Sequence, residues 1–114
     1  MPAAQPALDV SLSHSADTSQ VCLLGEFDLS GVGAVENALD RAFQAPATRR
    51  VVFDLRRLTF LDGAGLRTIL RADQRALAAA LELVVVRPRG TANRVFTLTR
   101  AGKQLKIVNQ LSVL

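Results

Sequence analysis

The chain has 114 residues, 49% of them hydrophobic, with a formal net charge of +4 and a single cysteine. This length suits one domain with one core; the single cysteine excludes an internal disulfide framework, and no apolar run approaches the roughly 20 residues of a membrane span. Residues 1–48 carry one basic and six acidic side chains, whereas residues 49–114 carry thirteen basic and four acidic ones. Nucleic-acid-binding proteins show such asymmetry, but no aromatic platform or known binding motif accompanies the charge, so we interpret the arginines as a solvated surface.

The N-terminal quarter predicts a tail and a hairpin. Residues 1–7 have neither a basic region nor a hydrophobic stretch, so we expect a flexible tail, no secretory signal and a cytoplasmic location. Residues 8–114 are expected to form a single domain. Apolar and polar residues alternate in 8–12, which predicts a half-buried strand. The polar stretch 13–19 is typical of a turn, and the apolar run 21–24 predicts the second strand of the hairpin.

A first helix is predicted after this hairpin. Ser30 is its expected N-cap, and Pro46 ends it because proline disfavours helix in the preceding residue. Its apolar stripe recurs at helical spacing and consists of Val32, Val35, Leu39, Ala42 and Phe43.

The most informative stretch is the junction Phe60–Leu66, which lies between a strand predicted for 51–55 and a second helix predicted for 64–80. Asp62 can cap that helix by accepting a hydrogen bond from a free backbone N–H. The two glycines of the junction lack a Cβ, so another molecule can approach the backbone closely. Because a helix N-terminus also favours a carboxylate or a phosphate, we expect the function to reside here.

The second helix has an apolar and a basic face. Its core-facing side chains are expected to be Leu66, Ile69, Leu70 and Leu77. Asp73 falls within this stripe on a helical wheel, so its carboxylate should reach solvent or an arginine. Arg67, Arg71 and Arg75 form a basic stripe, which we interpret first as a solvated face and alternatively as a docking surface for an acidic partner.

The last third of the chain predicts a buried strand at 83–86, a short helix capped by Thr91 and broken at 101–102, and a short strand at 106–108. The apolar residues of that short helix are Val95, Phe96 and Leu98. A hairpin followed by alternating helices and strands predicts an α/β fold, a mixed sheet of four to five strands with helices packed on it.

Catalytic chemistry has few candidates. His14 is more consistent with a solvated loop residue than with a ligand, because metal sites need several converging ligands. Cys22 is interpreted as a small buried hydrophobe, with an intermolecular redox role as the alternative. Residues 63–65 begin a dinucleotide-binding pattern, but Thr68 stands where its third glycine belongs. We therefore expect no enzyme activity, no metal and no cofactor.

Three blocks of the sequence resemble the STAS domain family, the fold of bacterial anti-sigma factor antagonists and of regulatory domains on anion transporters. The segment Gly25–Asp28 (GEFD) is similar to the family's G-E-hydrophobic-D strand end. The segment Asp54–Leu66 (DLRRLTFLDGAGL) is similar to its D-L-x-x-hydrophobic-x-F-hydrophobic-D-S-x-G-L signature. Arg94-Val95-Phe96, with Thr99 and Gly102, resembles the family's end region. The likeness spans residues 8–110 and implies the STAS-like version of the α/β fold.

The resemblance implies a regulatory switch at Gly63. In the family, the serine after the aspartate is phosphorylated by an anti-sigma factor that is also a kinase, and phosphorylation breaks the complex. Here this phosphoacceptor-equivalent position is Gly63 and the next is Ala64, so neither carries a hydroxyl. Two interpretations remain open. Either Gly63 mimics the unmodified serine and the partner binds without a phosphate brake, or recognition has drifted to another role.

The resemblance also implies the partner. It points to a non-enzymatic domain that binds an anti-sigma factor of the GHKL kinase type, and it is compatible with a homodimer. The implied partner-binding residues are Asp28, Asp62, Gly63, Ala64, Gly65 and Arg67. One alternative is a STAS subunit of a membrane transport system of the ABC type, which would bind the transporter ATPase. Another is a weak nucleotide-binding or basic nucleic-acid-binding module.

Overall fold

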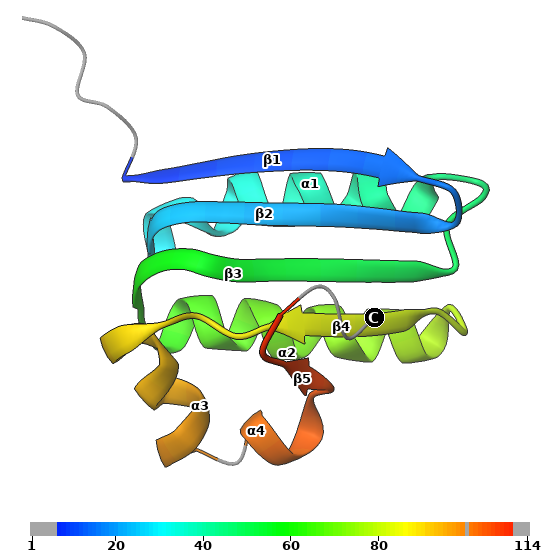
Figure 1. Cartoon of the computed structure of the whole chain (residues 1–114). Coiled ribbons are helices and arrows are strands. Elements are labelled where there is room, and N and C mark those ends of the chain that lie inside the picture. The colour runs from blue at the N-terminus through cyan, green and yellow to red at the C-terminus, as the bar shows by residue number, and fades with distance from the viewer. Residues whose placement is uncertain (1–6, 100, 111–114) are drawn as a thin grey trace, which may run out of the picture.

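Five strands form one mixed sheet in the order β1-β2-β3-β4-β5 (Figure 1). The structure, a computed structural model, describes residues 7–99 and 101–110. β1 pairs antiparallel with β2, and every later pair of neighbours is parallel. The strands are β1 (Leu8–Ser15), β2 (Thr18–Phe27), β3 (Arg50–Leu61), β4 (Glu82–Val86) and β5 (Ile107–Val108). The predicted α/β fold with a mixed sheet is confirmed.

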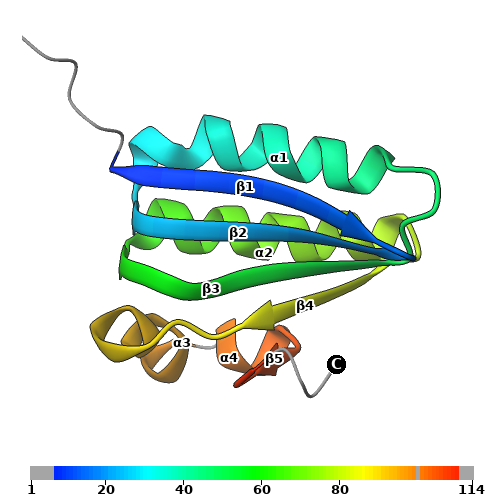
Figure 2. The same cartoon turned by 45° about the horizontal axis from the view of Figure 1, so that its top comes forward.

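Two long helices, α1 (Val32–Gln44) and α2 (Gly63–Ala78), lie side by side on one face of the sheet (Figures 1 and 2). They connect β2 to β3 and β3 to β4, the crossovers that parallel strands require. The short helical segments are η1 (Leu29–Gly31), η2 (Gly90–Asn93), α3 (Arg94–Leu98) and α4 (Ala101–Gln104). Figure 1 shows α3 and α4 beyond β4, away from β1.

The hairpin is confirmed, but its turn is shorter than the predicted 13–19. Val10 pairs with Leu23 and Leu12 with Val21, so the apolar residues of both strands share one face. Only Ala16 and Asp17 lie in the turn, and Ala16 has a φ of 52°. The polar residues on either side belong to the strands, because β1 is exposed there and needs no apolar side chains.

The helix caps differ from the prediction. The carboxylate of Asp28, rather than the hydroxyl of Ser30, caps the first helical turn by accepting from the Ser30 backbone N–H at 3.0 Å. α1 then begins at Val32 without a side-chain cap. Thr91 lies inside η2 and caps nothing, and the predicted break at 101–102 is the start of α4. The stop before Pro46 is confirmed, since α1 ends at Gln44.

The core lies between the sheet and the two long helices. The predicted stripe of α1 is confirmed, since Val35, Leu39 and Ala42 are buried and the two flanking members pack against the core. The stripe of α2 is partly wrong. Ile69 is buried and Leu66 and Leu70 are half-buried, but Leu77 is 68% exposed. The buried residues of α2 are Gly65, Thr68, Ile69, Ala72 and Ala76. Small residues therefore occupy the centre of this face.

Asp73 lies at the margin of this buried face. It is half-buried, and burial raises the pKa of its carboxyl. It forms no ion pair with any residue that the structure describes, so the arginine expected as one possible partner is not found among these residues.

Two substitutions on α2 test this core. Ile69→Ala should lower the free energy of unfolding by about 2–5 kcal/mol, because it leaves a cavity at a site with no solvent exposure. Leu77→Ala should change it by less than about 0.5 kcal/mol, because an exposed leucine loses few contacts. Urea denaturation of both variants checks this. A larger cost for Leu77→Ala than for Ile69→Ala would mean that α2 presents its other side to the sheet.

Candidate functional site

Two carboxylates lie beside each other where β2 and β3 end. Phe27 pairs with Leu61 as the last residue of each strand. The backbone N–H of Asp62 then donates to the carbonyl oxygen of Phe27 at 3.3 Å. The residues that follow the two strands, Asp28 and Asp62, are therefore brought to the same end of the sheet.

Each of these carboxylates caps a helical turn. Asp62 Oδ1 accepts from the backbone N–H of Gly65 at 2.9 Å, which confirms the predicted cap of α2. Asp28 Oδ1 accepts from both the hydroxyl of Ser30 at 2.6 Å and its backbone N–H. These hydrogen bonds from Ser30 lower the pKa of Asp28. The Asp28 carboxylate is thus held against the turn that begins η1, and the Asp62 carboxylate against the first turn of α2, while both side chains remain partly exposed.

The three small residues at the start of α2 have different surroundings. Gly63 is exposed and Ala64 half-buried, but Gly65 is buried. A Cβ on Gly65 would lie 2.6 Å from Leu61 Cδ1 and 2.9 Å from the Phe27 carbonyl oxygen. Gly65 therefore serves the packing of α2 on the strand ends, and of the three small residues only Gly63 and Ala64 reach the surface.

Gly63 has open space around it. A Cβ on Gly63 would meet only the Nη1 atom of Arg67, at 3.4 Å. Arg67 is exposed and forms no ion pair with any described residue. The turn therefore presents a carboxylate at Asp62, bare backbone at Gly63 and a guanidinium at Arg67. Two large apolar side chains near the turn are also exposed, and the sequence pattern did not identify them as surface residues. Leu29 follows Asp28 and is 73% exposed, and Phe60 precedes Leu61 and is 47% exposed.

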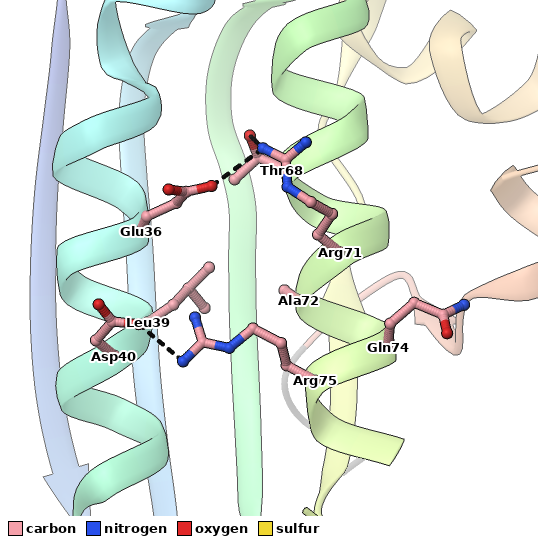
Figure 3. Close-up of a pocket in the computed structure, with 8 residues that line it drawn as sticks. All are labelled: Glu36, Leu39, Asp40, Thr68, Arg71, Ala72, Gln74 and Arg75. Atoms are coloured by element: carbon pink, nitrogen blue, oxygen red, sulfur yellow. Dashed lines mark hydrogen bonds and ion pairs between the residues drawn. The ribbon is translucent and has the colours of Figure 1, made fainter. Parts of the chain in front are cut away.

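The basic stripe of α2 is divided. Arg71 pairs with Glu36 of α1 at 3.0 Å, and Arg75 pairs with Asp40 at 2.7 Å (Figure 3). The Arg75 guanidinium also lies 4.8 Å from the centre of the Phe43 ring. These arginines bridge α1 and α2 over a hollow of about 370 Å³ and remain exposed, which agrees with the interpretation of a solvated face, although their charges are paired. Of the stripe, Arg67 alone borders the turn.

Cys22 lies in a polar cluster on the sheet face away from the helices, because it alternates with the core residues Val21 and Leu23. Its half-buried thiol donates to Asp54 Oδ2 at 3.6 Å and accepts from Gln20 Nε2 at 3.2 Å. Burial, and then the charge of Asp54, raise the pKa of the thiol. The expectation of a plain buried hydrophobe is therefore wrong.

Asp54 is the charged centre of this cluster. Burial opposes its ionisation, but hydrogen bonds from the side chain and backbone of Arg56 outweigh burial and hold the pKa of Asp54 below its ordinary value. Arg56 donates to both carboxylate oxygens, at 2.9 and 2.8 Å. This bidentate pair fixes the guanidinium in one orientation.

His14 is exposed, as expected, but it lies in β1 with Nδ1 2.7 Å from the Ser19 hydroxyl. Across residues 7–99 and 101–110, no group of three or more His, Cys, Asp or Glu side chains is placed to hold a metal ion. Over the same residues, no helix is both long and apolar enough to cross a bilayer.

A family model described as "Mlab, STAS domain" matches residues 10–109. The chain belongs to the STAS domain family. Its fold is similar to that of an anti-sigma factor antagonist from Mycobacterium paratuberculosis, with 25% identity, a TM-score of 0.81, and coverage of 93% of this chain and 89% of the other. A search of curated protein sequences finds no match to the chain.

Two further solved structures share this fold at lower identity. The unphosphorylated anti-sigma factor antagonist SpoIIAA has a TM-score of 0.75 at 21% identity, with 92% of each chain covered. An anti-sigma factor antagonist structure from Thermotoga maritima, described as putative, has a TM-score of 0.77 at 16% identity, with 91% of this chain and 89% of the other covered.

The two glycines of the STAS turn should respond differently to alanine. Gly65→Ala should cost about 1–3 kcal/mol of stability, because the new methyl group meets backbone at Phe27. Gly63→Ala should be neutral or should stabilise the domain by up to about 1 kcal/mol, because the site is open and alanine favours helix. Thermal unfolding followed by circular dichroism separates them. Equal midpoints would contradict the close approach of α2 to β2.

The low pKa of Asp54 predicts how stability depends on pH. A carboxylate whose pKa is depressed in the folded state stabilises the protein above its unfolded pKa, about 3.9 for aspartate, and loses this effect as pH falls through the folded value. Stability of the STAS domain should therefore fall below about pH 4, and Asp54→Asn should flatten that fall. The measurement is the urea midpoint from pH 6 to pH 2. Parallel curves for both proteins would contradict the prediction, since the other acidic groups are common to both.

Proposed function

We propose that this STAS domain is a non-enzymatic, cytoplasmic anti-sigma factor antagonist that binds its partner through the start of α2 and lacks the family's phosphate brake. The family match and the structural relatives support a regulatory role in general terms. One observation carries the finer proposal. Gly63, at the position of the family's phosphoserine, is exposed at the first position of α2 and flanked by the Asp62 carboxylate and the Arg67 guanidinium.

The partner would be an anti-sigma factor, of the GHKL kinase type. Its surface can approach the backbone of Gly63 closely, since glycine has no side chain and only the Arg67 guanidinium lies beside it. Asp28 and Asp62 supply negative charge beside that point, and Arg67 supplies positive charge. Charges arranged in this way select a partner and set its orientation more than they raise affinity.

The hydroxyls nearest to the turn along the chain are both engaged. Thr59 Oγ1 donates to the carbonyl oxygen of Gly25 at 3.2 Å. Thr68 Oγ1 donates to the carbonyl oxygen of Ala64 at 3.0 Å, and Thr68 is 1% exposed. Neither hydroxyl supplies a substitute for the serine that is missing at residue 63.

The test adds a carboxylate where the family carries a phosphate. Gly63→Asp should weaken binding to the anti-sigma factor by about 2–5 kcal/mol, because it adds bulk and a second carboxylate beside Asp62 where the partner approaches, and it engages Arg67, which the partner would otherwise contact. The fold should tolerate it, since acidic residues are favourable in the first turn of a helix. Partner affinity is measured by calorimetry, and circular dichroism confirms folding.

The matched control is Ala47→Asp. Ala47 is exposed in the loop before β3, at the opposite end of the sheet, so this variant adds the same charge far from the turn. It should bind like the wild type. Unchanged affinity in folded Gly63→Asp would mean that the partner binds another surface of the domain.

In the presence of ATP, a kinase partner should phosphorylate Gly63→Ser but leave residues 62–66 of the wild type unmodified.

A second candidate function is a STAS subunit of an ABC-type transport system. The observation that favours it is again the absence of a hydroxyl from Asp62 to Leu66, which a permanent subunit does not need. The same surface would then contact the transporter ATPase. Binding of the protein to a transporter ATPase, and not to an anti-sigma factor, would select this alternative.

A further inference from the structure

Three arginines surround one concave site away from the turn. Arg56 and Arg57 lie in the second half of β3, and Arg89 lies in the loop after β4. Two adjoining hollows of about 360 and 320 Å³ share all three side chains. Figures 1 and 2 show the chain after β4 running alongside this half of β3, and η2 contacts β3. We call this site the arginine pocket; its remaining lining residues are Leu58, Thr59, Gly90 and Thr91.

An irregularity in β3 brings two consecutive arginines to the pocket. Cys22 of β2 pairs with Asp54, but Leu24, two residues later, pairs with Arg57, three residues later. β3 therefore holds one extra residue at this point. In a regular strand, neighbouring side chains point to opposite faces, whereas a bulge redirects one of them. The backbone N–H of Arg56 donates to Asp54 Oδ1, so this conformation is fixed by a hydrogen bond.

The pocket has an uncompensated positive charge. Arg56 is paired with Asp54, but Arg57 and Arg89 form no ion pair with any described residue. Two of the five N–H donors of Arg56 are used by Asp54, and three are left for a ligand. The fixed guanidinium thus supplies one oriented wall, and the two exposed arginines supply the excess charge.

We propose that the arginine pocket binds a phosphate monoester. Such a group carries up to two negative charges, which match the two arginines that lack an acidic partner. The planar forks of arginine also suit paired contacts with phosphate oxygens. The hollows are open to solvent, so a ligand there is expected to be held by charge rather than by enclosure. Among the residues that the structure describes, no aromatic side chain lines the pocket, which disfavours single-stranded nucleic acid as the ligand.

The phosphate can come from a soluble metabolite or from a lipid headgroup, since both present the same chemistry. The first arm of the test titrates the full chain with glycerol 3-phosphate and follows backbone amides by NMR. Amides of residues 56–59 and 89–91 should shift in a saturable way. The second arm sediments the protein with phosphatidylcholine vesicles that contain or lack phosphatidic acid.

The variants Arg57→Gln and Arg89→Gln should each weaken binding about tenfold or more, because each loses a charge-assisted contact. Arg41→Gln is the matched control. Arg41 is exposed in the last turn of α1, far from the pocket, and its loss changes net charge equally. All three variants replace exposed side chains, and their NMR spectra show whether they are folded.

Binding of glycerol 3-phosphate supports a metabolite site, and sedimentation with phosphatidic acid alone supports a lipid headgroup, provided that the two pocket variants lose the effect. If neither glycerol 3-phosphate nor phosphatidic acid binds, the proposal is overturned. Equal weakening by Arg41→Gln also overturns it, since binding would then follow net charge. The pocket variants should keep the wild-type affinity for the partner of the turn, so this test is independent of the proposed function.

Discussion

The site depends on a close contact between the first turn of α2 and the end of β2, which requires that residue 65 have no side chain. Gly65 lies against the carbonyl oxygen of Phe27, and the N–H of Asp62 donates to the same oxygen. This contact places Asp62 beside Asp28 and directs Gly63 outward. The two glycines of the turn therefore have separate tasks. Gly65 allows the approach of two elements, and Gly63 leaves the backbone exposed at the surface.

β3 links the turn and the arginine pocket. It is longer than β2, and its register against β2 shifts twice, before Arg57 and again before Phe60. Each shift adds a residue to β3 and changes which face the next side chain reaches. The first shift brings Arg56 and Arg57 to the same pocket, and after the second shift the side chain of Leu61 lies in the core, directly before Asp62. Both surfaces thus arise from irregular pairing in a single strand.

The succession of strands and long helices along the chain and the cap at Asp62 followed from the sequence, because alternation, apolar runs and capping residues are local signals. The exposed position of Leu77 did not. A helical wheel marks leucines as core, whereas the buried centre of α2 is formed by residues such as Ala72 and Ala76, which let the helix lie close to the sheet.

Contacts between segments that are distant in the sequence could not be predicted either. The pairing of Arg71 with Glu36, and the burial of Gly65 against Phe27, depend on tertiary packing that no spacing reveals. The turn itself was found because aspartate and two glycines between a strand and a helix have a local physical meaning. Its division into a packing glycine and an exposed glycine was not.

Ion pairs account for part of the excess of basic residues in the second half of the chain. Glu36 and Asp40, from the acidic half, are paired with arginines of α2, and Glu82 joins Arg50 to Lys106 across β3, β4 and the residue before β5. Such exposed pairs contribute little to stability. They leave the arginine pocket as a place where positive charge gathers without enough carboxylates.

The basic residues are also chemically alike. Of the thirteen in residues 49–114, eleven are arginine and two are lysine. Lysine serves solubility as well as arginine does, but only arginine offers a planar fork to an oxyanion. Arg56 donates two of its N–H groups to the Asp54 carboxylate, and this pairing fixes the Arg56 guanidinium in the wall of the arginine pocket. A surface meant only to be solvated needs no such fixed orientation, so the pair of Asp54 and Arg56 is the feature that distinguishes a binding site from a basic surface.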